Sequence, residues 1–135
     1  MVIREAQLAD IFEITNILID EMYKEVGIGK PVRSKILDYV TFLFENGALY
    51  VAQTNIVKRD GSGTELAGMV GAHVTQWWWS DQNFLSEDFT FVRKKFRKGR
   101  LALKLMNKLD AHAKKLKMPL VTGLFNDVQQ DRKNI

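Results

Sequence analysis

The sequence predicts one α/β (α+β) domain over residues 1–135, with a mixed, mostly antiparallel sheet flanked by helices. Two observations carry this prediction. Strand-like and helix-like runs follow one another in the order β-α-α-β-β-β-α-β, without internal repeats or low-complexity tracts. A hydrophobic content of 46% over 135 residues is also enough for a single core of ordinary size.

The first half of the chain begins with a short strand and two helices. Residues 2–5 form the strand, and the spacing of apolar residues by three and four over 8–22 predicts an amphipathic helix. Glycines and Pro31 interrupt that pattern. A second helix is predicted from about Val32 to the stop signal at Asn46-Gly47, so two helices precede the next strand.

A hairpin and a further strand follow. Residues 48–55 and 65–76 are rich in β-forming side chains, and the polar segment 58–63 between them predicts a long antiparallel turn. Another strand is predicted over 88–92. It leads directly into a basic turn.

The most regular helix of the sequence is predicted from about Lys98 to Lys117, where the apolar residues form one stripe and most lysines face elsewhere. Pro119 ends this helix, and residues 120–125 predict a buried strand before a polar tail.

Three consecutive tryptophans, Trp77-Trp78-Trp79, precede the strand at 88–92. Alternate side chains of a strand face opposite ways, so at least one of them should be exposed. An exposed tryptophan could line an acceptor pocket or anchor a protein partner, and the alternative is a core edge with a capped loop.

Composition excludes several chemistries. The chain has no cysteine, which rules out a disulfide, a thiolate zinc site and a thiol nucleophile, and we predict no metal site. The first ten residues are charged and lack the apolar core of a signal peptide. No apolar run approaches the roughly 20 residues that a membrane span needs, so we expect a cytoplasmic location.

Basic residues cluster strongly in one short segment. Seven of them fall within twelve positions: Arg93, Lys94, Lys95, Arg97, Lys98, Arg100 and Lys104. Such a cluster could bind nucleic acid, bind a phosphorylated small molecule, or form a solvated face.

The predicted helix start favours the phosphorylated ligand. Backbone N–H groups at a helix N-terminus attract anions, and Arg97, Lys98 and Arg100 would add charge at the same point. Nucleic-acid binding ranks last, because the cluster is confined to one turn and contains a single aromatic residue, Phe96.

This segment resembles the GNAT family of acyl-CoA N-acyltransferases, in which a strand is followed by Arg/Gln-x-x-Gly-x-Gly/Ala at the start of a long helix. Arg97 matches the first position of the motif, Ala102 the last, and Phe96 the aromatic residue that often precedes it. Arg100 stands where the family usually has its central glycine, with Gly99 one place earlier. The tryptophan segment also resembles small GNAT-like proteins of tailed phages.

The resemblance implies acetyl-CoA as co-substrate. It implies that the pyrophosphate lies at the turn and that the pantetheine follows the preceding strand, with a further contact from the next strand. The residues implied are Phe91, Val92, Arg97, Lys98, Gly99, Arg100, Leu101, Ala102 and Asn126.

The resemblance also implies elements beyond residue 135. Members of the family usually continue through a short helix with a tyrosine motif and two final strands, and that tyrosine protonates the departing thiolate. We therefore expect the domain to lack its C-terminal strands. A natural short form, a fragment and a loss of catalysis all remain open.

The implied reaction is transfer of an acetyl group to an amine, which requires removal of a proton from that amine. Glu87 and Asp88, at the predicted strand start, are the candidate general bases, and their alternative interpretation is a solvated strand end. His73 is the next candidate, with a structural histidine as its alternative. His112 is interpreted as a boundary residue of the long helix.

A second hypothesis is an inactive GNAT-derived module that binds or inhibits another protein. Arg100 in the glycine position, the absent tyrosine motif and the tryptophans motivate it. The sequence names neither the acceptor nor the partner, and it leaves a homodimer open.

Overall fold

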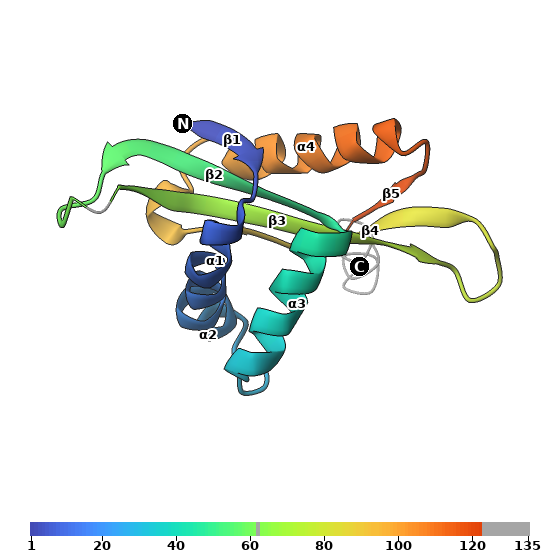
Figure 1. Ribbon diagram of the computed structural model, residues 1–135, viewed down its shortest axis with the longest axis horizontal. Helices are drawn as coiled ribbons and strands as arrows, with labels where there is room; N and C mark the ends of the chain where they lie inside the picture. Colours follow the sequence, from blue (N-terminus) through green and yellow to red (C-terminus); the bar gives the residue numbers. More distant parts are fainter. Residues whose placement is uncertain (62, 123–135) are drawn as a thin grey trace, which may run out of the picture.

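The computed structural model describes residues 1–61 and 63–122. Within these residues the predicted order β-α-α-β-β-β-α-β is confirmed (Figure 1). The elements are β1 (Val2–Glu5), η1 (Leu8–Asp10), α1 (Ile11–Ile17), η2 (Leu18–Met22), α2 (Tyr23–Val26), α3 (Arg33–Asn46), β2 (Ala48–Val57), β3 (Thr64–Gln76), β4 (Asn83–Val92), η3 (Lys94–Phe96), α4 (Leu101–Lys115) and β5 (Leu120–Val121).

The five strands form one sheet in the order β1-β2-β3-β4-β5. All neighbours are antiparallel except β4 and β5, which are parallel, so the predicted mixed, mostly antiparallel sheet is confirmed. Helices α1, α2 and α3 cover one face of the sheet, and α4 covers the other (Figure 1).

Each face of the sheet has its own hydrophobic core. On the α1 and α3 face the core includes Ile14, Leu43 and Met69, which are fully buried. On the α4 face, Leu105 and Leu109 pack on small strand residues such as Ala67 and Ala72. Of the apolar stripe predicted for the long helix, α4 buries Leu105, Leu109 and Ala113, whereas Leu116 near its end is 43% exposed.

Strand β4 is longer than the sequence predicted. We expected it over 88–92, but it begins at Asn83, and the pairing of β3 with β4 extends from Val92 back to Asn83. Phe84 and Leu85 are buried in this additional part. Glu87 and Asp88 consequently lie in the middle of the strand, and the prediction that they occupy its start is wrong.

Helix α4 begins later than predicted. The sequence placed its start near Lys98, but the helix begins at Leu101, after the short turn η3 and the connecting residues 97–100. Gly99 has a φ of +111°, which a helix does not tolerate and which glycine adopts readily. The N-terminus of the helix therefore lies three residues beyond the predicted position.

Candidate active site

Strand β5, in its described part, pairs with β4 at Leu85 and Ser86, close to the beginning of β4. Among residues 1–61 and 63–122, no strand pairs with β4 on that side from Asp88 to Val92.

A β-bulge interrupts the pairing of β3 with β4. Gly71 of β3 is opposite Phe89, whereas Ala72 is opposite Glu87, so Asp88 is the extra residue. The bulge changes which way the neighbouring side chains face. Asp88 contacts Tyr39 of α3, whereas Glu87 is bonded to Thr90, which contacts α4 on the opposite face.

Asp88 is the centre of a small polar cluster. The Tyr39 hydroxyl donates a hydrogen bond to Asp88 Oδ1, and His73 Nδ1 lies 2.8 Å from Asp88 Oδ2. When Nδ1 of His73 carries the proton, the imidazole donates to Asp88 and its Nε2 remains an acceptor. Burial raises the pKa of Tyr39, and its bond to Asp88 raises the pKa further, so the phenol stays protonated near neutral pH.

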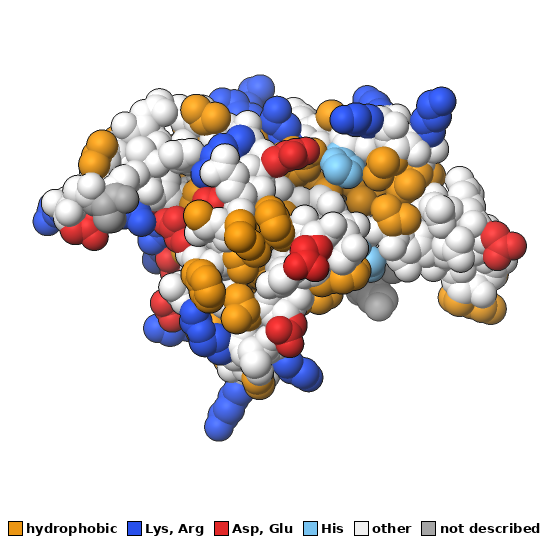
Figure 2. Space-filling view, viewed as in Figure 1, with side chains coloured by type: hydrophobic (Ala, Val, Ile, Leu, Met, Phe, Trp, Pro, Cys, Tyr) orange, Lys and Arg blue, Asp and Glu red, His pale blue; other side chains and the backbone are white. Residues whose placement is uncertain are grey.

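A pocket of about 630 Å³ opens in front of this cluster. It lies between the segment 18–23, helix α3 and strand β4. Figure 2 shows further hydrophobic side chains on the surface between α1 and α3. The walls of the pocket are formed by Leu18, Met22, Tyr23, Lys35, Ile36, Asp38, Tyr39, Val40, Phe42, Asp88 and Phe89. A volume of this size suits a small organic ligand.

The two predicted carboxylates are not brought together. Thr90 donates its hydroxyl to Glu87, and the same hydroxyl lies 3.1 Å from Met106 Sδ of α4. Asp88 lines the pocket on the other face of the sheet. His73, which sequence reasoning ranked below both carboxylates, is the direct partner of Asp88.

Sequence reasoning missed Tyr39 and the pocket wall around it. Tyr39 and Phe42 are each 42% exposed and flank the buried stripe of α3. The sequence did offer one signal for this site: two aromatic residues lie beside the apolar stripe of the helix and are not needed for the core. Tyr39 is 49 residues from Asp88 along the chain, so sequence spacing does not link them.

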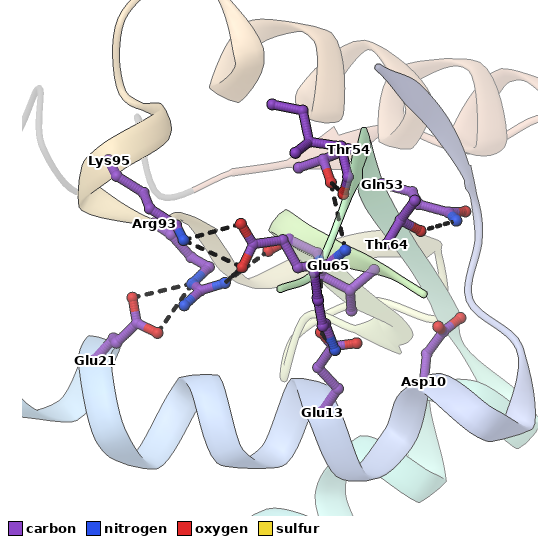
Figure 3. A network of polar contacts seen from close by, with 12 residues as sticks. Asp10, Glu13, Glu21, Gln53, Thr54, Thr64, Glu65, Arg93 and Lys95 are labelled. Atoms are coloured by element: carbon purple, nitrogen blue, oxygen red, sulfur yellow. Dashed lines mark hydrogen bonds and ion pairs between the residues drawn. The ribbon is translucent and has the colours of Figure 1, made fainter. Parts of the chain in front are cut away.

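Part of the basic cluster is held by acidic side chains. Arg93 Nε lies 3.0 Å from Glu21 Oε2, and its Nη1 lies 3.2 Å from Glu65 Oε2. Lys95 also pairs with Glu65, at 2.9 Å (Figure 3). Desolvation of Arg93 opposes its charge, but the bonds to Glu21 and Glu65 outweigh that effect and raise its pKa.

Arg97, the first residue of the motif, is also held by the protein. Its Nε donates to the Val92 carbonyl at 2.8 Å, and Nη2 lies 2.7 Å from Glu25 Oε2. Its guanidinium carbon lies 5.4 Å from the centre of the Phe91 ring. Arg97 therefore fastens the end of β4 to α2.

The remaining basic residues surround the start of α4. Lys94, Lys98, Arg100 and Lys104 have no acidic partner in the described part of the chain. Among the described residues, no side chain caps the N-terminus of α4, whose N-cap residue is Arg100. Its first N–H groups, which have no partner within the helix, are therefore available to an anion.

Two hollows flank this helix start. One, of about 60 Å³, is lined by Val92, Phe96, Arg97, Gly99, Leu101 and Ala102. The other, of about 230 Å³, is lined by Met1, Ile3, Phe96, Lys98, Gly99, Arg100, Leu101 and Lys104. The structure thus brings together all the residues predicted at the turn. Asn126 lies outside the described residues.

The tryptophans lie in the turn between β3 and β4. Trp77 stacks on Phe84 with ring centres 4.1 Å apart, whereas Trp78 is 92% exposed and Trp79 63% exposed. The prediction that at least one is exposed is confirmed. Figure 2 shows hydrophobic side chains projecting from the tip of this hairpin.

His112 lies on α4, away from the pocket, as a half-buried residue whose Nδ1 is 2.8 Å from the Tyr50 hydroxyl. In the described residues, no helix combines the length and apolar character required to cross a bilayer.

Several solved structures that share the fold are acetyltransferases of distant sequence. A predicted acetyltransferase from Clostridium acetobutylicum, crystallised with acetyl-CoA, has a TM-score of 0.71 and 12% identity, covering 90% of this chain and 79% of that one. A possible acetyltransferase from Clostridium difficile 630 has a TM-score of 0.66 and 17% identity, covering 99% and 89%. Arabidopsis thaliana NAA60, in complex with a bisubstrate analogue, has a TM-score of 0.65 and 12% identity, covering 90% and 72%.

No curated protein matches the sequence significantly. The sequence model of the Acetyltransferase (GNAT) family, however, matches residues 11–133, which is most of the chain. The resemblance predicted from the turn is thereby confirmed, and the chain belongs to the GNAT acetyltransferase family.

Proposed function

We propose that this protein transfers an acetyl group from acetyl-CoA to an amine, with Asp88 as the residue that accepts the proton of that amine. One observation carries the proposal. The β-bulge between β3 and β4 and the wall of the 630 Å³ pocket coincide at Asp88. A thioester lying along β4 would therefore meet an amine bound in the pocket at this residue.

The residues of the turn fit a CoA diphosphate. Free N–H groups at the start of α4 and the cationic side chains of Lys98 and Arg100 supply donors and positive charge. A Cβ at Gly99 would meet no atom within 4 Å, so the backbone is accessible there. Arg100 lines the larger hollow and not the one with Arg97 and Ala102, so its side chain leaves that hollow open.

Acetyl-CoA supplies the activated acyl group, and the residues of the chain prepare the amine. Asp88, fixed by Tyr39 and His73, is positioned to take a proton from the ammonium form and leave a nucleophilic neutral amine. Because Tyr39 stays protonated, it keeps donating to Asp88 and holds the carboxylate in one orientation. We assign no proton transfer to Glu87, which lies on the α4 side of the sheet.

The matched pair Asp88→Asn and Glu87→Gln tests this proposal. Release of CoA would be followed with a thiol reagent, and acetyl-CoA binding by calorimetry. Asp88→Asn should lower kcat by about 10² to 10³ without weakening acetyl-CoA binding, because general-base contributions are of that size. Glu87→Gln should change kcat by no more than about threefold.

Failure of the wild-type protein to bind acetyl-CoA would overturn the proposal, as would equal losses of kcat in the two variants. Thermal unfolding of both variants is the control, since a folded Asp88→Asn protein attributes the lost rate to the carboxylate.

A further inference from the structure

The pocket in front of Asp88 is mainly apolar. Segment 18–23 contributes Leu18 and Met22, α3 contributes Phe42, and β4 contributes Phe89. These side chains line the space between the helices and the sheet, so a ligand that fills it exchanges water for hydrocarbon contacts.

Few charged side chains line this pocket. Lys35 and Asp38 are both exposed side chains of α3, and their charges oppose each other at the rim. Asp88 is the remaining ionisable carboxylate of the lining, and its side chain is only 14% exposed. The described lining therefore presents one enclosed negative group, which suits a ligand with a single cationic head.

Aromatic rings stand next to that carboxylate. The rings of Tyr39 and Phe42 have centres 6.1 Å apart, and Phe42 meets the His73 ring edge-on at 6.3 Å. Tyr39 and His73 are the two residues that bond Asp88. An ammonium group at Asp88 would thus lie beside aromatic faces, which attract cations and also pack on apolar or aromatic groups.

From these observations we infer that the acceptor is a primary amine carried on an apolar or aromatic body. Its nitrogen lies at Asp88, and its body packs against Met22, Phe42 and Phe89. This inference rests on the proposed acetyl transfer and names the acceptor class of that site. Polyamines, amino sugars and lysines of basic peptides are disfavoured, because their additional charges or hydroxyls would be placed against apolar walls.

A primary amine on an apolar body occurs in free arylalkylamines and at the N-terminus of a peptide that begins with a large apolar residue. One experiment can test both kinds of acceptor. Initial rates with acetyl-CoA would be compared for 2-phenylethylamine, a short peptide beginning with Phe, spermidine, glucosamine and an N-terminally blocked lysine peptide.

We expect kcat/KM for 2-phenylethylamine, for the Phe peptide, or for both, to exceed that of each polar amine by about tenfold or more. Phe42→Ala should raise the KM of the preferred amine about tenfold and leave the affinity for acetyl-CoA unchanged. Phe12→Ala is the matched control, because Phe12 is an exposed aromatic residue outside the pocket lining.

Equal or faster acetylation of spermidine, glucosamine or the lysine peptide would overturn this inference and leave acetyl transfer itself intact. If no amine is acetylated, binding of 2-phenylethylamine is measured directly by calorimetry. Binding that is weakened by Phe42→Ala supports the apolar amine site although the proposed transfer fails, whereas absence of binding overturns the site as well.

Discussion

The seven basic residues between positions 93 and 104 look alike in the sequence, but the structure divides them into two groups. Arg93, Lys95 and Arg97 are paired with glutamates of η2, α2 and β3. The second group, Lys94, Lys98, Arg100 and Lys104, has no acidic partner in the described residues and is exposed around the start of α4.

This difference separates structural charge from charge available to a ligand. A guanidinium held by two glutamates has already satisfied much of its hydrogen-bonding capacity within the protein. An exposed lysine or arginine at a helix N-terminus can bind a phosphate without breaking an existing pair. The first group should therefore govern stability and the second group ligand affinity, and the four predictions below test that division.

Replacement of Arg93 should have the largest effect. Arg93→Met removes the shared partner of Glu21 and Glu65 at a side chain that is only 18% exposed, and should lower the free energy of unfolding by about 2 kcal/mol. The adjacent Lys94→Met should change it by less than about 0.5 kcal/mol. Urea denaturation measures the free energy of unfolding of both variants, and equal losses would contradict the proposed division.

Removal of charge from the second group should mainly weaken the binding of acetyl-CoA. The double variant Lys98→Ala/Arg100→Ala should lose about tenfold in affinity, about 1.4 kcal/mol, because charge-assisted bonds to the diphosphate are lost. Calorimetry at low and moderate salt should show a weaker salt dependence than wild type. Lys108→Ala, an exposed charge farther along α4, is the control; a similar loss there would point to general surface charge.

Arg97 belongs to the structural group in this division, but its pair is more exposed. The Arg97 and Glu25 side chains are 42% and 44% exposed, so their coupling should be below about 1 kcal/mol. A double-mutant cycle with Arg97→Gln and Glu25→Gln, followed by urea denaturation, measures it. If this coupling is as large as the loss of unfolding free energy in Arg93→Met, exposure does not determine which of these ion pairs is stronger.

Acidification should produce the smallest effect. The hydrogen bond from Lys95, helped by Arg93, holds the pKa of Glu65 below its ordinary value. A lowered folded-state pKa adds stability above the ordinary value, and that stability is lost as the pH falls through the folded pKa. A fall from about pH 5 to about pH 3 should therefore lower the free energy of unfolding slightly more in wild type than in Glu65→Gln. The difference should be less than about 1 kcal/mol. Identical pH slopes would contradict this.

The order of helices and strands could be predicted because periodicity is a property of neighbouring residues. The stripe of α4 and the β-rich composition of β2 and β3 are visible in a short window of the sequence. The basic turn was likewise recognisable from contiguous residues. Boundaries were less certain, as the later start of α4 and the earlier start of β4 demonstrate.

The sequence by itself determined the succession of elements, the two-sided packing of the sheet and the family turn. Only the tertiary structure decided that Asp88 faces the pocket while Glu87 faces α4, because the bulge arises from the register between β3 and β4. It also decided which cations are neutralised. Arg93 meets Glu21 across 72 residues of chain and Asp88 meets Tyr39 across 49, and contacts at such separations exist only once the chain has folded.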